Sequence, residues 1–101
     1  MPSRRNSQLS DADAELIGLK ALGFVAEDGD RLERFLALSG VDVRALRAQA
    51  SDPQTLAGIL AHLLQDESLL LSFAANQQLQ PEEISAAHRL LSGAHESSDW
   101  P

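Results

Sequence analysis

Cysteine and tyrosine are absent from this 101-residue chain, and valine and threonine are rare. Without cysteine the chain has no disulfide, no thiolate nucleophile and no thiolate metal site, as is usual in a reducing cytoplasm. The scarcity of β-branched and aromatic residues argues against strands. No apolar run approaches the roughly 20 residues of a membrane helix. The opening MPSRRNSQLS has no apolar segment after its arginines, so we expect no signal peptide, no membrane association and a cytoplasmic location.

Positive charge is also scarce, because the net charge is −7. A negative balance disfavours nucleic acids and acidic lipids as partners. The few bases are clustered: residues 31–47 contain four arginines and only two acids, whereas residues 51–88 contain five acids and no lysine or arginine. The cluster gives the candidate partner-binding residues, Arg31, Arg34, Arg44 and Arg47.

Apolar residues, mostly leucine and alanine, make up 44% of the chain and recur at helical spacing. This pattern predicts an all-α fold, a compact bundle of five or six short helices at residues 10–93. Helix starts are predicted after capping side chains or at proline, namely at Ser10, Asp28, Asp42, Asp52, Asp66 and Pro81. Gly40 and Gly93 are predicted stops. We expect the helix ESLLLSFAANQQ near the centre, and residues 1–9 and 94–101 to be disordered tails.

The two halves of the chain resemble each other at an offset of 38 residues. The matched pairs are Asp28 with Asp66, Leu32 with Leu70, Phe35 with Phe73, Val41 with Leu79, Leu46 with Ile84 and Ala48 with Ala86. This order of cap, core and turn positions predicts two pseudo-repeated three-helix units about a pseudo-twofold. Gly18, Gly23 and Gly58 each lower helix propensity by roughly 1 kcal/mol, which a close crossing of the first and fourth helices would explain.

The stretch RFLALSGVDVRALRAQASDPQTLAGILAHLLQDESLLLSFAA resembles a small bacterial all-helical family that is catalogued only as a domain of unknown function. The resemblance covers about Leu16 to Leu91 and rests on the leucine pattern with FLALSG, SDP and PEE. It implies a helical fold and brings no catalytic residue, cofactor or partner. The family often has glycine before the aliphatic residue of the second turn. This chain has Gln78 before Leu79, so we do not expect a simple left-handed turn there.

No residue set in the sequence predicts a catalytic or metal site. His62, His88 and His95 have no metal-ligand spacing, and no thiols accompany them. We expect His62, which falls outside the apolar stripe of its helix, to be a solvated or rim residue, and His88 to be half-buried. Glu82 and Glu83 are adjacent, hence about 100° apart on a helix, which suits interaction with the helix dipole better than paired-carboxylate catalysis. The prediction is a protein that is not an enzyme and needs no cofactor.

The arginine cluster supports an alternative function, DNA binding by a helix-turn-helix. In FLALSGVDVRALRAQA, Gly40 lies at the turn, Leu46 faces inward, and Arg44 and Arg47 lie one turn apart. Arg31 and Arg34 on the preceding helix would add backbone contacts, and Arg4 and Arg5 would form a minor-groove arm. The similarly spaced FAANQQLQPEEIS would present glutamates to phosphates. The acidic flanks disfavour DNA, and an ordinary helical hairpin with arginines paired to Glu33 or Asp30 is the competing interpretation.

Protein–protein interaction, as a non-catalytic adaptor module or by self-association, is the favoured function. The fourth and fifth helices are rich in large apolar residues, namely Leu60, Leu63, Leu64, Leu69, Leu70, Leu71 and Phe73. Those that the core does not bury would form an interface, but all of them can equally belong to the core. Trp100, the only tryptophan, is either a docking anchor or an isolated tail residue.

Overall fold

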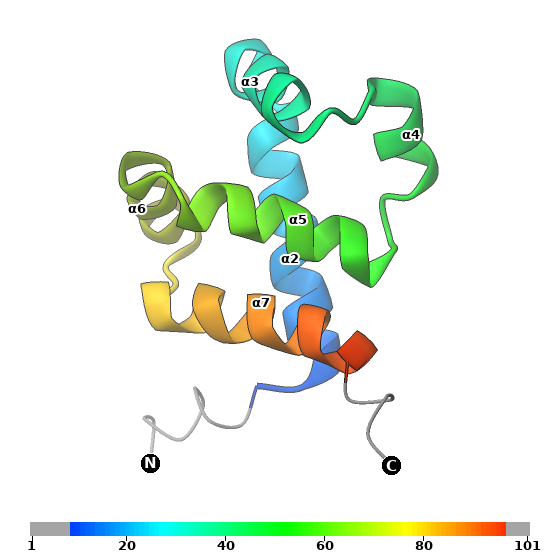
Figure 1. Ribbon diagram of the computed structural model, residues 1–101. Coiled ribbons are helices and arrows are strands. Elements are labelled where there is room, and N and C mark those ends of the chain that lie inside the picture. Colours follow the sequence, from blue (N-terminus) through cyan, green and yellow to red (C-terminus); the bar gives the residue numbers. More distant parts are fainter. Residues whose placement is uncertain (1–8, 97–101) are drawn as a thin grey trace.

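Residues 9–96 are described by the computed structural model, with side-chain environments given for residues 9–93. Within this range the chain forms α-helices and no strand (Figure 1). The helices are α2 (Asp11–Ala26), α3 (Gly29–Ser39), α4 (Val43–Ala48), α5 (Pro53–Leu64), α6 (Glu67–Gln77) and α7 (Pro81–Glu96). The predicted all-α fold is therefore confirmed.

The predicted helix starts are confirmed by side chains that cap the first turns. Ser10 forms a capping box, in which its hydroxyl accepts the Asp13 N–H at 3.0 Å and the Asp13 carboxylate accepts the Ser10 N–H at 3.1 Å. Four aspartates accept backbone N–H groups at the other starts, namely Asp28, Asp42, Asp52 and Asp66. Gly40 ends α3 in the left-handed conformation, with φ of 78°.

Two predicted boundaries are wrong. Helix α7 continues through Gly93 to Glu96, because Gly93 does not adopt the left-handed conformation that would end it, so residues 94–96 are not a tail. Leu9, assigned to the N-terminal tail, is partly buried against the core. The rest of the predicted tails, with Arg4, Arg5 and Trp100, lies outside the described residues.

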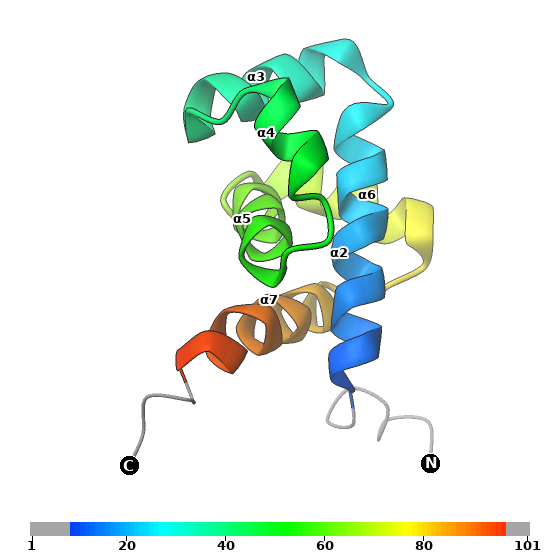
Figure 2. The same ribbon diagram turned by 90° about the vertical axis from the view of Figure 1, so that its right-hand side faces the viewer.

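The core lies where α2, α5 and α7 pack against one another (Figures 1 and 2). Its buried side chains include Ile17, Leu56, Leu60 and Ile84. Gly18 lies at the crossing of α2 and α5, since a Cβ there would be 2.8 Å from the Leu56 Cβ. The predicted close crossing is therefore confirmed at this glycine, but not at Gly23 or Gly58, whose Cβ positions are open.

Helix α6 lies at the periphery, so its predicted central position is wrong. Only Phe73 and Ala74 are buried in it, and Leu71 is 49% exposed. Most of the leucines of α5 and α6 nevertheless contact the core, either buried or packed against it. In the described range no single helix is long and apolar enough to cross a membrane, and α5 and α6 satisfy that test only as a pair bent by 112°.

The 38-residue repeat is present in the positions of the helices. Boundaries lie 38 residues apart at the ends of α2 and α5, at both ends of α3 and α6, and at the starts of α4 and α7. The core pairs agree in burial as well: Phe35 and Phe73 are buried, as are Leu46 and Ile84. The predicted twofold is incomplete, because α7 packs extensively on α2 and α5 whereas α4 has no comparable contact.

Gln78 occupies the same left-handed position in the second unit that Gly40 occupies in the first. Its φ is 56°, its N–H donates to the Ala75 carbonyl at 3.3 Å, and the Leu79 N–H donates to the Ala74 carbonyl at 2.9 Å. These bonds satisfy the last carbonyls of α6 and stabilise a conformation that a residue with a Cβ rarely adopts. Our expectation against a left-handed turn at Gln78 was therefore wrong.

Candidate functional site

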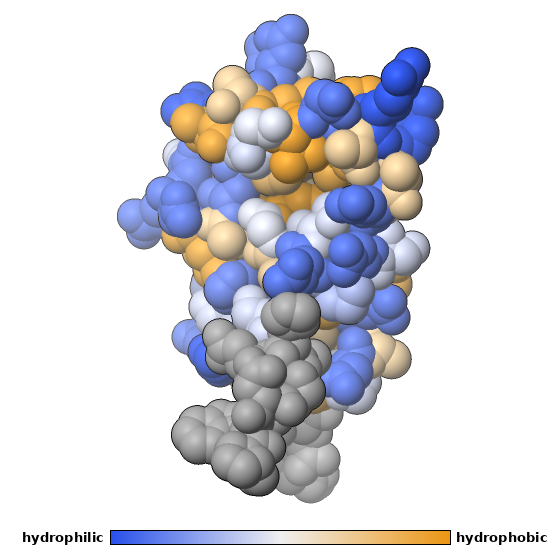
Figure 3. Space-filling model, turned by 45° about the vertical axis from the view of Figure 1, so that its right-hand side comes forward, coloured by the Kyte–Doolittle hydropathy of each residue, from blue (hydrophilic) through white to orange (hydrophobic). Residues whose placement is uncertain are grey.

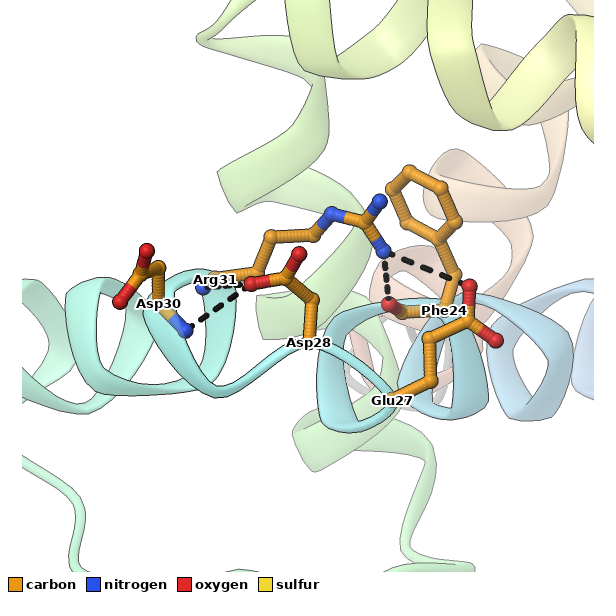
Figure 4. A network of polar contacts seen from close by, with 5 residues as sticks. All are labelled: Phe24, Glu27, Asp28, Asp30 and Arg31. Carbon is orange, nitrogen blue, oxygen red and sulfur yellow. Dashed lines mark hydrogen bonds and ion pairs between the residues drawn. The ribbon is translucent and has the colours of Figure 1, made fainter.

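Arg31, one of the candidate partner-binding residues, fixes the corner between α2 and α3 (Figure 4). Its Nη1 donates to the Phe24 carbonyl at 2.6 Å, and its guanidinium carbon lies 3.9 Å from the centroid of the Phe24 ring. It also forms an ion pair with Glu27 at 3.5 Å, rather than with Glu33 or Asp30 as we had considered. One guanidinium nitrogen and the ring-facing side of Arg31 are therefore engaged inside the chain.

The four arginines are not gathered on one face. Arg31 lies over Phe24, whereas Arg47 lines a groove with Leu22 and Ala26. Because successive helical residues are about 100° apart, Phe24 points to the opposite side of α2 from Leu22 and Ala26. Arg34 lies one turn after Arg31 on α3, close enough to His62 to lower its pKa. Arg44 and Arg47, which are both exposed, form a corresponding pair on α4.

Helix α4 is the most weakly held helix of the described chain. It has six residues, and only Leu46 is buried. Its length is limited by Pro53, because proline disfavours helical conformation in the residue before it and Asp52 must cap α5. The equivalent helix of the second unit, α7, meets no such proline and has 16 residues. Because α4 is short, it leaves protein surface uncovered on both of its own sides.

A groove of about 220 Å³, which we call the α2–α4 groove, lies on one side of α4. Its lining is apolar apart from one arginine and consists of Leu22, Ala26, Leu32, Val43, Leu46, Arg47 and Ala50. Val43 is 42% exposed. Figure 3 shows hydrophobic side chains reaching the surface in the upper part of the molecule, where Figure 1 places α3 and α4, with hydrophilic side chains around them.

A second groove, of about 250 Å³, lies between α4 and α5. Its lining is mixed, with Phe35, Val41 and Leu46 beside Gln49, Asp52 and Thr55. Leu46 lines both grooves, so a single side chain separates them. The contrast in lining makes the α2–α4 groove the better site for an apolar ligand surface.

His62 is half-buried against α3, which agrees with the rim position and not with a fully solvated one. Its ring packs edge-on against Phe35, with centroids 5.2 Å apart, and its buried Nε2 has no hydrogen-bond partner. Burial lowers the pKa of His62; nearby Asp66 raises it and Arg34 lowers it further. The neutral ring is therefore the form that this packing stabilises. His88 is half-buried as predicted, 3.5 Å from the Ser92 hydroxyl.

No group of three or more His, Asp or Glu side chains is arranged to hold a metal ion within the described residues. The leucines that we considered as an interface are mostly core, because Leu60 and Leu63 are fully buried and Leu71 alone is strongly exposed. Sequence reasoning missed the groove residues on α2. The spacing of Leu22 and Ala26 off the buried face was the signal that could have indicated them.

A family model matches residues 11–94 and describes a protein of unknown function, DUF3572. The match covers most of the chain, which therefore belongs to this family and confirms the resemblance to a domain of unknown function. No curated protein and no solved structure shows significant similarity to the chain.

Proposed function

We propose that this member of the DUF3572 family is a non-catalytic protein–protein interaction module that binds an amphipathic helix of a partner protein in the α2–α4 groove. The observation that carries the proposal is the apolar lining of this groove next to an exposed Val43. Arg44 and Arg47 provide a charged rim, so the partner helix carries acidic residues beside its apolar face. The cysteine-free composition favours a cytoplasmic location for this module.

The repeat supports this choice of surface. In the second unit α7 packs over both α2 and α5, whereas its counterpart α4 stops after six residues. The first unit thus exposes apolar surface at the place where the second unit is closed by its own chain. Because α4 is held by the single buried Leu46, it can shift to fit a bound helix at small energetic cost.

A quantitative capture experiment tests the proposal. The immobilised protein is compared with Val43→Asp, which places a charge in the groove, and with Leu38→Asp, which changes a 71% exposed leucine outside both grooves. A partner captured by wild type and by Leu38→Asp is then produced pure and its Kd measured. We expect Val43→Asp to weaken binding at least about tenfold, or about 1.4 kcal/mol, and Leu38→Asp to leave it unchanged. Equal Kd values for Val43→Asp and wild type would rule out the groove.

The same protein is titrated against mixed-sequence duplex DNA by fluorescence anisotropy, at low and at physiological salt. We expect no salt-sensitive binding, because Arg31 is engaged internally and lies over Phe24, on the opposite side of α2 from the groove that Arg47 lines. Binding that falls steeply with salt and disappears with Arg44→Glu plus Arg47→Glu would instead favour the helix-turn-helix alternative.

A further inference from the structure

The outer face of α2 carries a row of small and apolar side chains, which we call the α2 seam. The row consists of Ala12, Leu16, Leu19, Gly23 and Ala26, at alternating spacings of four and three residues. All five are exposed, Leu16 by 51% and Leu19 by 40%. Figure 2 shows α2 running vertically, with α4 and α5 to its left and α6 behind it, extending further to the right.

The α2 seam differs from the face that α2 presents to the core. The core face consists of Ala14, Ile17, Gly18, Ala21, Phe24 and Val25. A surface helix normally has one apolar face, and a helix with two is usually covered on both. Alternation of four and three residues is the spacing by which two helices pair side by side. We propose that the α2 seam binds the same seam of a second copy of this chain, with the two helices antiparallel.

Antiparallel pairing brings complementary side chains together. Centring the pair between Leu16 and Leu19 places Leu16 beside the partner's Leu19, and Ala12 beside the partner's Gly23. The two leucine pairs fill the middle, and the small residues at either end permit close approach of the backbones. Gly23 suits this role, because a Cβ there would meet nothing within 4 Å in its own chain.

Charges beside the seam favour the antiparallel arrangement. Lys20 is the only lysine in the sequence and lies on the same flank of the seam as Asp13. In the antiparallel register each Lys20 comes beside the partner's Asp13, which gives two ion pairs. A parallel pair would instead bring together the acidic first turns, each with Asp11 and Asp13, where like charges repel.

A groove of about 300 Å³ adjoins the seam on this flank and extends the contact surface. Its apolar lining is Leu9, Leu16, Ile17 and Leu79. The seam itself is short, since the 16 residues of α2 span about 24 Å. A contact strip of that length and about 10 Å wide would bury roughly 500 Å² over both copies together. This area is well below the roughly 1,600 Å² of a stable interface. The pair is therefore weak and depends on concentration. Its proposal does not rest on partner binding in the α2–α4 groove, with which the seam shares Ala26.

Disulfide trapping tests the register directly, because the native chain has no cysteine. Ala12→Cys and Gly23→Cys are mixed at about 0.5 mM, a concentration chosen for an interface far smaller than standard size, and oxidised mildly. Intact-mass spectrometry then identifies the products. We expect the mixed 12–23 dimer to exceed both homodimers, and to disappear at hundredfold dilution. Ala37→Cys, exposed on α3 and off the seam, is the control for random collision. Homodimers in excess, or a mixed dimer no more abundant than that with the control, would overturn the proposal.

Sedimentation velocity over the same range of concentrations provides a second measurement without cross-linking. We expect the average mass of wild type to rise toward that of a dimer, and the rise to be lost with Leu16→Glu plus Leu19→Glu. Leu38→Glu adds a charge at a 71% exposed leucine elsewhere and should associate like wild type. Circular dichroism confirms that each variant is folded. A wild type that stays monomeric, or a seam variant that associates as wild type does, would show that the seam does not pair.

Discussion

Replacing Gly18 with alanine should destabilise the domain, although alanine is the better helix former. Gly18 lies in the middle of α2, and its missing side chain lets α2 approach α5 at Leu56. A Cβ at position 18 would lie 2.8 Å from the Leu56 Cβ and 3.3 Å from its Cγ and Cδ1. The Leu56 Cβ is fixed to a buried backbone and cannot move aside alone, so the two helices must separate.

Two opposing contributions determine the size of the effect. Alanine in place of an interior helical glycine stabilises by about 1 kcal/mol. Overpacking in a filled core costs up to about 3 kcal/mol, and a contact between two Cβ atoms belongs at that upper end. We therefore expect Gly18→Ala to lower the free energy of unfolding by about 2 kcal/mol.

Gly23→Ala is the matched control, because it makes the same change in the same helix where the added Cβ meets nothing within 4 Å. It should raise the free energy of unfolding by about 1 kcal/mol. Urea unfolding, followed by circular dichroism at micromolar concentration to avoid self-association, measures both. The two variants should differ by about 3 kcal/mol, from the two contributions just given. If Gly18→Ala were as stable as Gly23→Ala, the close crossing of α2 and α5 would be refuted.

Three further substitutions probe other contacts. His62→Leu should reduce the loss of stability on acidification. Because the pKa of His62 is lowered in the folded chain, the unfolded chain binds the proton more readily, and wild type is destabilised as pH falls through about 6.5. Urea unfolding midpoints measured from pH 8 to pH 5 would show this. Arg31→Ala should cost about 2 kcal/mol, because it removes a charged hydrogen bond and a cation–π contact with Phe24, as measured by thermal unfolding. Gln78→Gly should stabilise by about 1 kcal/mol in the same assay, since glycine adopts positive φ without strain.

Two of these substitutions have a control variant in the chain. Arg44→Ala, at an exposed arginine, should change stability by less than about 0.5 kcal/mol, so an equal effect of Arg31→Ala would contradict the corner contact. Gly40→Ala should destabilise by about 1 kcal/mol, in the opposite direction to Gln78→Gly. A pH profile that is unchanged by His62→Leu would assign the acid sensitivity to other groups.

Helix boundaries could be predicted from sequence because the interactions that set them are local. Asp28 and Asp66 cap helices by accepting N–H groups two or three residues away, and Gly40 closes α3 through one bond to the Leu36 carbonyl. The repeat was visible for the same reason, since caps and turns recur in order. Gln78 escaped prediction because its conformation depends on hydrogen bonds rather than on residue type.

The arrangement of the candidate site could not be predicted, because it depends on which helices pack against one another in the folded chain. Arg31 has the same spacing pattern as a solvated arginine, and only the packing of α3 beside Phe24 reveals its internal contacts. Likewise the leucines of α5 and α6 have the composition of either an interface or a core, and it is their contact with α2 and α7 that places most of them inside.

The contact between α2 and α7 also governs how the chain acquires its structure during synthesis. Residues 11–26 are made before all the helices that they contact, and one extensive partner, α7, begins only at Pro81. Helix α2 can pack on α3 and α5 as these are made, but nearly the whole domain must leave the ribosome before α2 can pack on α7. Until then α2 exposes the surface that α7 covers as well as the α2 seam, and the nascent chain presents a target for chaperones that bind hydrophobic helices.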